Sequence, residues 1–398
     1  MKRIAVVLAV LLVTAAVPVG SVTAQQSNTD ASAYAGTHVS FDTEANALTN
    51  YTVDGTTVVE SVETSSKADA SVGLDVALSA VTDIDASGLS LSSTSETNAT
   101  VSAESGATLR AHDNPKGTLV VAAGDESQYV TANLSADASA EQEGDSRVVV
   151  ENDGRQGAFI VVGDGSVTVN DDGNVTADLS EDARLVFRSY SGERTDDDKQ
   201  TEELIASGEA AAEVYVMQEG GETTMDAVHY GENTTVEMTE QTEETVTVTI
   251  DRSVNQGTVV VTSVSEEALE ATDNLSVMVD GEAAMKAESY TELQSAANGG
   301  DTSKYLVQET SAEGEANVLV AVNHFSERQV TMSGDDSSST SGESSETESD
   351  TDATESDETT SGEEAADTTT SSTSAPGFGA GLTVVALAGA ALIARRRA

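Results

Sequence analysis

The chain has 398 residues, with 70 acidic against 18 basic side chains, which gives a formal net charge of −52 at pH 7. Nucleic-acid binding depends on clustered Lys and Arg, so this charge excludes a nucleic-acid partner. The sequence contains no Cys, which excludes disulfide scaffolds, thiolate zinc sites, Fe–S clusters and cysteine nucleophiles.

The N-terminus, residues 1–24, has the pattern of a secretory signal peptide. Lys2 and Arg3 form a short basic segment, an apolar run follows from Ile4 to Val19, and small residues lead up to Ala24. This order of basic, apolar and small residues is typical of a segment removed during export. We expect cleavage after Ala24, and the shortness of the apolar run disfavours an uncleaved membrane anchor.

The middle of the chain, residues 30–332, alternates apolar and polar residues with a period of two, which predicts a mainly β fold. Asp-Gly pairs, a strong hairpin signal, separate β-rich runs at Asp54-Gly55, Asp172-Gly173 and Asp280-Gly281. Strands are predicted at Leu48–Val53, Thr56–Val59, Leu119–Ala122, Arg147–Val150, Phe159–Val162, Leu185–Phe187, Val214–Met217, Thr245–Ile250, Val259–Val264, Tyr305–Val307 and Val318–Val322.

A weak internal repeat of about 40 residues favours stacked β modules. Runs that begin at Gly117, Val130 and Arg147 are echoed by runs that begin at Gly157, Val175 and Arg184, with a third start at Gly257. Tandem β-sandwich-like modules are therefore the predicted fold class. A β-solenoid is the alternative, and it fits best the small-residue tract Ala70–Ala111.

Few short helices are expected, at Ser265–Ala271 and at Ser289–Ala297, where Ser289 and Glu292 have capping-box spacing. The charged, Gly-containing segment 191–200 is the predicted domain boundary. It divides the body into a first β-rich domain, residues 30–190, and a second, residues 201–332.

Catalytic motifs are absent from the sequence: there is no serine-hydrolase elbow, P-loop, HExxH or dinucleotide GxGxxG pattern. No two of the four histidines, His38, His112, His229 and His324, are close in sequence. We interpret them as surface or half-buried structural residues. The sequence therefore predicts a protein that is not an enzyme and has no cofactor.

Specific metal binding is not predicted either. The stretch Thr168 to Gly173 approaches the start of a calcium loop, but it has Thr in the first position and no closing Glu, and a hairpin explains it more simply. Asp196–Asp198 is interpreted as a solvated charge run in a loop.

Six Asn-x-Ser/Thr sequons are spread along the body, and none has Pro in the middle position. They are Asn50, Asn98, Asn133, Asn174, Asn233 and Asn274. We expect several of them to be solvent-exposed and to carry glycan.

The segment 333–375 holds 13 acidic residues and no basic, aromatic or large aliphatic residue, the remainder being almost all Ser, Thr, Gly and Ala. Such a segment buries too little apolar surface to offset its ordering entropy. It is predicted to be a disordered, extended stalk suited to O-glycosylation.

A tripeptide, an apolar run and a basic cluster follow one another in residues 376–398. They are Pro376, Gly377 and Phe378, then Ala380–Ala394, then Arg395, Arg396 and Arg397. The segment Phe378–Ala394 would make about 25 Å of helix, enough to span a thin bilayer, and the positive-inside rule would keep the arginines in the cytoplasm. This end resembles the PGF-CTERM sorting signal of haloarchaeal surface proteins. The resemblance implies that an archaeosortase removes the tail and that a membrane lipid takes its place; a plain single-span anchor is the alternative.

The composition resembles that of proteins from extreme halophiles, since acids abound and there are only six lysines. At molar salt the Debye length falls to about 3 Å, which screens the self-repulsion of such a chain. The expected function is a secreted, surface-anchored glycoprotein with a non-catalytic structural, adhesion or binding role in the cell envelope, at the surface layer or with an extracellular partner. The competing hypothesis is a surface-tethered hydrolase or solute-binding component without a recognisable motif.

Overall fold

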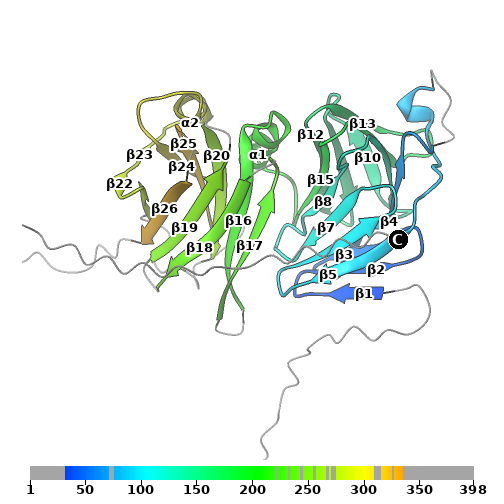
Figure 1. Cartoon of the computed structure of the whole chain (residues 1–398), viewed down its shortest axis with the longest axis horizontal. Helices are drawn as coiled ribbons and strands as arrows, with labels where there is room; N and C mark the ends of the chain where they lie inside the picture. The colour runs from blue at the N-terminus through cyan, green and yellow to red at the C-terminus, as the bar shows by residue number, and fades with distance from the viewer. Residues whose placement is uncertain are drawn as a thin grey trace, which may run out of the picture. The chain divides into compact units, whose positions relative to one another are not determined.

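A computed structural model describes residues 32–70, 76–219, 222–231, 234–242, 245–253, 257–265, 269, 275–308, 315–324 and 327–334. These residues are mainly β-strand and form four separate sheets, here called A to D (Figure 1). The expected mainly-β class of tandem sandwich-like modules is confirmed. Within the described residues, no helix is both long enough and apolar enough to cross a bilayer.

Sheets A and B take their strands from residues 32–190 and are antiparallel throughout. In spatial order, sheet A consists of β1 (Ser32–Ala35), β2 (Val39–Thr43), β3 (Leu48–Val53), β4 (Thr56–Ser66), β9 (Gln128–Asn133), β14 (Val175–Leu179) and β13 (Gly165–Val169). Sheet B consists of β10 (Ser139–Gln142), β11 (Arg147–Asn152), β12 (Arg155–Val162), β15 (Arg184–Tyr190), β8 (Leu119–Ala122), β7 (Thr108–His112), β6 (Asn98–Ala103) and β5 (Leu89–Thr94). A short 3-10 helix, η1 (Leu78–Ala80), precedes β5.

Sheets C and D take their strands from residues 210–334. Sheet C consists of β17 (Glu222–His229), β16 (Ala210–Glu219), β20 (Thr258–Ser265), β25 (Glu315–Val322), β24 (Lys304–Gln308) and β23 (Met285–Lys286). Sheet D consists of β18 (Thr234–Gln241), β19 (Thr245–Arg252), β26 (Glu327–Gly334), β21 (Leu275–Val279) and β22 (Glu282–Ala283). Two pairs in sheet C, β16 with β20 and β23 with β24, are parallel.

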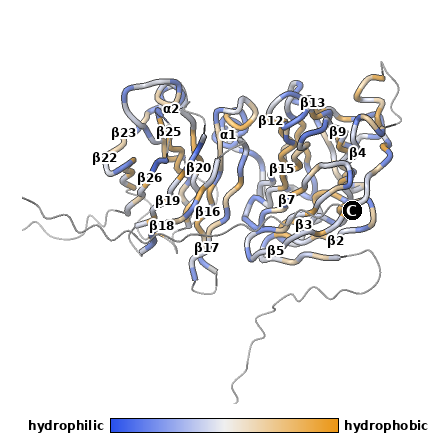
Figure 2. The backbone as a smooth tube through the Cα atoms, viewed as in Figure 1, coloured by the Kyte–Doolittle hydropathy of each residue, from blue (hydrophilic) through white to orange (hydrophobic). Residues whose placement is uncertain are grey.

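Three hydrophobic cores join the four sheets in the order A, B, C, D. The A–B core is built from strands of the first two sheets, and the C–D core from strands of the last two. Between them, the B–C core combines residues of both inner sheets with residues of α1 (Asp196–Ala206) and α2 (Tyr290–Ala297). Hydrophobic segments accordingly concentrate in the inner strands (Figure 2). Sheets B and C are therefore covered on both faces.

The inner strands are apolar at consecutive positions because both of their faces are buried. In β12, Ile160 faces the B–C core while its neighbours Phe159 and Val161 face the A–B core. In β20, Val259 belongs to the B–C core and Val260 to the C–D core. Strands buried on both faces are expected to be near-continuous apolar runs rather than alternating ones.

All three predicted Asp-Gly hairpins are present. At Asp54-Gly55 and Asp280-Gly281 both residues have positive φ, as a two-residue type I′ turn requires. Asp172-Gly173 instead lies in a longer turn closed by the Asn170 N–H, which donates to the Asn174 carbonyl at 2.8 Å. The Asn170 side-chain oxygen accepts from two backbone N–H groups of this turn, so the hairpin accounts for the calcium-like spacing.

The internal repeat corresponds to paired strands. Its copies supply β8 and β12, β9 and β14, and β11 and β15, and β9 pairs directly with β14 in sheet A. The small-residue tract, where a solenoid fitted best, forms the antiparallel strands β5, β6 and β7. The sandwich prediction therefore holds over this tract as well.

Helix α2 confirms the predicted helix at Ser289–Ala297, because the Ser289 hydroxyl caps the Glu292 N–H. Apart from Ser265, which ends β20, and Leu269, the helix predicted at Ser265–Ala271 lies outside the described residues. Strand β26 continues through Ser333 and Gly334, two residues into the segment assigned to the stalk.

Helix α1 corrects the interpretation of Asp196–Asp198 as a loop. Thr195 and Asp198 form a reciprocal capping box, and the three aspartates occupy the first helical turn. Negative side chains at a helix N-terminus interact favourably with the helix dipole and with its free N–H groups. The predicted boundary segment 191–200 thus contains a helix start, and α1 contributes to the B–C core.

Candidate functional site

Two of the four histidines line the same cavity, contrary to the expectation that all are scattered on or near the surface. His38 is half-buried beside Asp54, and His324 is exposed. His112 ends β7 and is only 1% exposed, whereas His229 ends β17 and is half-buried. The prediction is wrong for His112, because sheet C covers the face of sheet B from which its side chain projects.

His112 and Asn114 bind one buried carboxylate of sheet C. Asp226 of β17 is 1% exposed, and its two oxygens lie 2.8 Å from His112 Nδ1 and 2.8 Å from the donating Asn114 Nδ2. A buried carboxylate is costly unless hydrogen-bonded partners compensate for lost water. These three side chains therefore tie sheet B to sheet C across 112 and 114 residues of sequence.

Asp113, between these two residues, binds sheet A instead. Its carboxylate accepts from the backbone N–H groups of Thr37, His38 and Val39 at 2.6, 2.7 and 2.7 Å. A side chain at Gly36 would collide with it, because a Cβ added to this glycine would lie 2.0 Å from a carboxylate oxygen of Asp113. The segment His112–Asn114 thus contacts three sheets.

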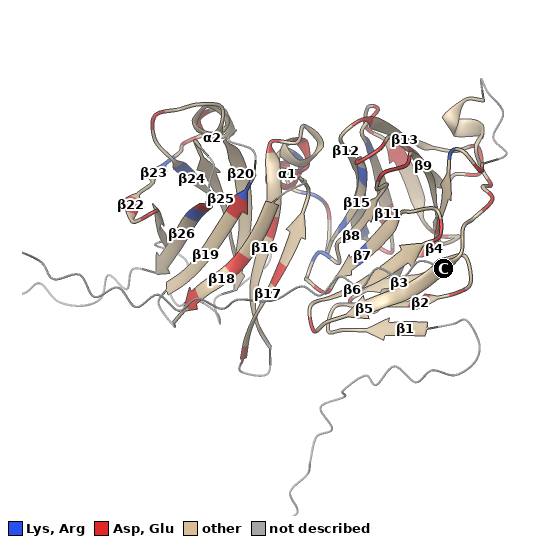
Figure 3. Cartoon of the chain, in the orientation of Figure 1, with Lys and Arg blue, Asp and Glu red and all other residues tan. Residues whose placement is uncertain are grey.

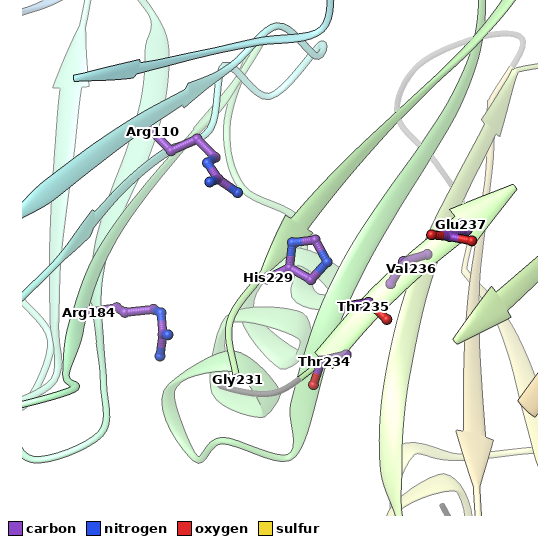
Figure 4. A pocket seen from close by; sticks show the side chains of 8 residues that line it. All are labelled: Arg110, Arg184, His229, Gly231, Thr234, Thr235, Val236 and Glu237. Atoms are coloured by element: carbon purple, nitrogen blue, oxygen red, sulfur yellow. The ribbon is translucent and has the colours of Figure 1, made fainter. Parts of the chain in front are cut away.

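A cavity of about 570 Å³ opens beside these residues (Figure 4). Arg110 of β7 and Arg184 of β15 extend from sheet B on one side, and His229 faces them from the other. Gly231 and the stretch Thr234–Glu237 of β18 complete its lining. An inner pocket of about 160 Å³ shares Arg110, Arg184 and His229 and reaches His112. We call the two adjoining spaces the arginine cleft.

The electrostatics of the arginine cleft are positive. Burial first, and then the nearby His112, Arg110 and Arg184, lower the pKa of His229 to about 4, against the opposing charge of Asp226. His229 is therefore neutral at pH 7. Its Nε2 atom is buried and has no hydrogen-bond partner among the described residues.

The two arginines of the cleft differ in how they are held. Arg184 donates to the backbone carbonyls of Asp182 and Tyr230, both at 3.3 Å, so its guanidinium is fixed in place. Arg110 is exposed, and within the part of the chain that the structure describes it has no ion pair and donates no hydrogen bond. Its guanidinium is available to a ligand.

Elsewhere in the B–C layer, buried charges are paired with one another. Arg188 of β15 lies 2.8 Å from Glu213 of β16, and the Tyr230 hydroxyl donates to the other Glu213 oxygen at 2.5 Å. Burial alone would lower the pKa of Arg188, but the Glu213 carboxylate holds it well above its ordinary value. Burial and the same carboxylate raise the pKa of Tyr230.

A second buried cluster lies where α1 meets sheet B. Arg194 donates to Glu202 at 2.6 Å and to Glu143 at 2.7 Å, and the Tyr190 hydroxyl donates to Glu202 at 2.8 Å. These groups bind one another, and their contacts fix α1 against sheet B. In the ranges that the structure covers, no group of three or more His, Asp or Glu is placed to hold a metal ion.

The sequon asparagines that the structure describes are all at least partly accessible. Asn50 is exposed, and Asn98, Asn133 and Asn174 are half-buried. Asn133 Nδ2, the atom a glycan would occupy, donates to Ser61 Oγ at 2.9 Å. The remaining predicted site residues lie outside the described residues: Ala24, Asn233, Asn274, Pro376, Gly377, Phe378, Arg395, Arg396 and Arg397.

The arginine cleft was not predicted, although the sequence carries a partial signal for it. Arg110 and His112 are two residues apart in a strand and therefore share a face. A basic residue and a histidine on the face opposite buried Leu109 and Ala111 indicated a polar surface, but not what covers it. The residues that complete the cleft are distant in sequence, and His112 and its partner Asp226, for example, are 114 residues apart.

Comparisons with known proteins give one family match. A MAST domain model matches residues 220–397, which is less than half of the chain. Among curated proteins there is no match. Among solved structures, a mutant of a glycoside hydrolase family 81 protein from Clostridium thermocellum is 12% identical, with a TM-score of 0.33. That comparison covers 76% of this chain and 35% of the other, and a likeness at this level carries no argument about activity.

Proposed function

We propose that this chain is a secreted, surface-anchored glycoprotein of a halophilic archaeon with a non-catalytic structural, adhesion or binding role in the cell envelope. The signal-peptide pattern, the acidic Ser/Thr segment and the PGF-CTERM-like end supply the addressing part of this proposal. The accessible Asn50, Asn98, Asn133 and Asn174 are compatible with glycosylation.

One observation of the body carries the non-catalytic part: its buried ionisable clusters hold layers together. Asp226 is bound by His112 and Asn114, and Glu213 is bound by Arg188 and Tyr230. His112 and Asp226 have the pairing of a general base and its orienting carboxylate. Their side chains are, however, only 2% and 0% exposed, and of the two only His112 lines the inner pocket, so the pair supports a structural role.

The anchoring is tested by mass spectrometry of the protein from native membranes. Wild type is compared with a variant carrying Pro376→Ala, Gly377→Ala and Phe378→Ala. We expect the wild type to lack the apolar tail and to carry lipid, while the variant retains residues 376–398. If both proteins keep the tail, processing by an archaeosortase is refuted and a single-span anchor takes its place.

A solute-binding component, or a hydrolase without a recognised motif, is the second candidate. The arginine cleft favours it, because it brings a half-buried, neutral histidine beside two arginines. Turnover of chromogenic esters and glycosides that is lost in His229→Gln would establish a hydrolase. Equal background rates in the two proteins would exclude that role for the cleft.

A further inference from the structure

The strands of sheet B carry more basic than acidic residues, whereas the whole chain is strongly acidic. These strands contain five arginines and two glutamates, although the whole sequence has 70 acidic and 18 basic residues. Figure 3 shows this concentration of basic residues on sheet B. Three of these arginines face acidic partners: Arg188 pairs with Glu213, Arg155 with Asp54, and Arg147 with Glu203. Arg110 has no such partner within the described ranges, and it lies in the arginine cleft.

A second, independent feature of the cleft is an unused polar atom. His229 Nε2 is buried and has no hydrogen-bond partner among the described residues, and the His229 side chain lies across the cleft from Arg110 and Arg184 (Figure 4). An unmade hydrogen bond at a buried polar atom costs about 1–3 kcal/mol, so such an atom in a native protein calls for a partner, such as a water, an ion or a ligand. In the neutral imidazole, Nε2 carries a proton and donates when the other ring nitrogen is the acceptor.

We propose that the arginine cleft binds an oxyanion group, a carboxylate or a sulfate, of an extracellular ligand. Arg110 supplies a planar fork of N–H donors, which matches two oxygens of such a group. His229 supplies a second donor from the opposite wall, and Arg184 adds positive charge from a fixed position. Thr234 and Thr235 also line the cleft, on the side of β18, where a hydroxylated ligand would meet side-chain hydroxyls (Figure 4).

The volume and the remaining charge limit what fits. A cavity of about 570 Å³ is in the range of small-molecule sites and accepts one or two sugar-sized units. Glu237 is an acidic residue in this lining, and it lies on the β18 side, away from the arginines (Figure 4). A ligand with its oxyanion towards Arg110 and its hydroxyls towards Glu237 matches the charge at each end of the cleft. This inference concerns the cleft alone and holds however the chain is anchored.

The test is a titration of the full-length protein with potassium sulfate, potassium glucuronate and neutral glucose, at constant ionic strength set by potassium chloride. The readouts are the heat of binding and the His229 pKa from the NMR shift of its ring, assigned with His229→Gln. A bound oxyanion stabilises the charged imidazolium form of His229. Its negative charge adds to that of Asp226 and opposes the positive charges of Arg110, Arg184 and His112. We expect the His229 pKa to rise from about 4 by about one unit.

The three ligands of this titration distinguish an oxyanion carried by a sugar from a free inorganic anion. Saturable binding of glucuronate but not sulfate assigns a sugar-borne carboxylate, and binding of sulfate alone assigns a free inorganic anion. Binding of both supports the shared chemistry. Equal binding of glucose, or no response to either anion over chloride, overturns the proposal.

Variants give the residue-level test. Arg110→Gln removes an exposed guanidinium without a partner among the described residues, so it is expected to leave the thermal unfolding temperature unchanged and to weaken oxyanion binding at least tenfold. Arg328→Gln is the matched control, because it removes one positive charge from sheet D, where Arg328 pairs with Asp280. If oxyanion binding is weakened equally in both variants, the effect comes from the overall charge of the protein, and a site at Arg110 is refuted.

Discussion

The A–B core and the B–C layer are both buried, but they are built from different interactions. In the A–B core, a chain of rings runs from Tyr34 through Phe41, Tyr51 and Phe187 to Phe159, with successive centroids 4.8–6.4 Å apart. The B–C layer combines aliphatic side chains with the buried pairs Arg188–Glu213 and His112–Asp226.

The difference follows from strand alternation in sheet B. One face carries the apolar residues of a sandwich with sheet A, and the other carries residues such as Arg110, His112 and Arg188 that suit solvent. Since sheet C covers most of this second face, the charges that it buries, such as Arg188 and Asp226, need partners, whereas Arg110 lies at the exposed cleft. The B–C layer therefore depends on specific pairs, whereas the A–B core depends on packed area.

The largest expected effect is from Glu213→Ala, which leaves Arg188 buried without its counter-charge and the Tyr230 hydroxyl without its acceptor. Removing one partner of a buried ion pair costs about 3–5 kcal/mol. We expect the free energy of unfolding, measured with denaturant in molar potassium chloride, to fall by that amount. Glu222→Ala, at an exposed position of β17, is the control and is expected to be within about 0.5 kcal/mol of wild type.

A combined variant sharpens this comparison. Arg188→Met with Glu213→Leu and Tyr230→Phe replaces the polar cluster by apolar groups, and such replacements are often neutral or stabilising. We expect it to recover most of the stability that Glu213→Ala loses. A combined variant as unstable as the single one would mean that the layer needs these charges for more than mutual compensation.

In the A–B core, the corresponding test is Leu109→Ala. Leu109 is fully buried and neighbours Arg110 in β7, so the change leaves a cavity on the opposite face of the strand. The expected loss in free energy of unfolding is about 3 kcal/mol, measured in the same denaturant series. Leu91→Ala in β5, where the side chain is only partly buried, should cost clearly less; equal costs would contradict a core held by packing.

The B–C layer should also be sensitive to acid through His229. Its pKa is about 4 in the folded state and about 6.5 when unfolded, so the unfolded state binds more protons between these values. Stability contributed by neutral His229 is complete above pH 6.5 and is lost as the pH falls towards 4. We expect a loss of about 2–3 kcal/mol over this window.

Carboxylates titrate near the lower end of the same window, so the informative quantity is the difference between wild type and His229→Gln. Their unfolding free energies, measured from pH 7 to pH 4, should converge as the pH falls. Parallel curves would show that His229 is not desolvated in the cleft. Arg110→Gln should raise the His229 pKa of the folded state, because Arg110 is among the charges that lower it. The pH range over which stability is lost should therefore be narrower in this variant.

How far the sequence predicted this structure depended on whether the determining contacts are local. Hairpins at Asp54-Gly55 and Asp280-Gly281 and the helix capped by Ser289 follow from neighbouring residues, and the structure confirms them. The start of α1 was equally local, but the capping pattern at Thr195 and Asp198 was obscured by the charge run. The arginine cleft was out of reach, because sequence patterns do not state which sheet covers the polar face of another.

The smallest expected effect on the free energy of unfolding comes from a turn glycine that lies outside both layers. Gly55 has φ 78° in the β3–β4 turn, and a Cβ added to it would meet no atom within 4 Å, so Gly55→Ala isolates backbone strain from packing. A left-handed conformation costs a non-glycine residue about 1 kcal/mol. Gly192→Ala is the matched control, because its Cβ would also meet open space and its φ lies outside the left-handed region. We expect a loss of about 1 kcal/mol in the first variant and none in the second, by denaturant unfolding. Equal losses would mean that the loss does not come from the left-handed conformation of Gly55, because replacing glycine acts on the unfolded chain in the stabilising direction.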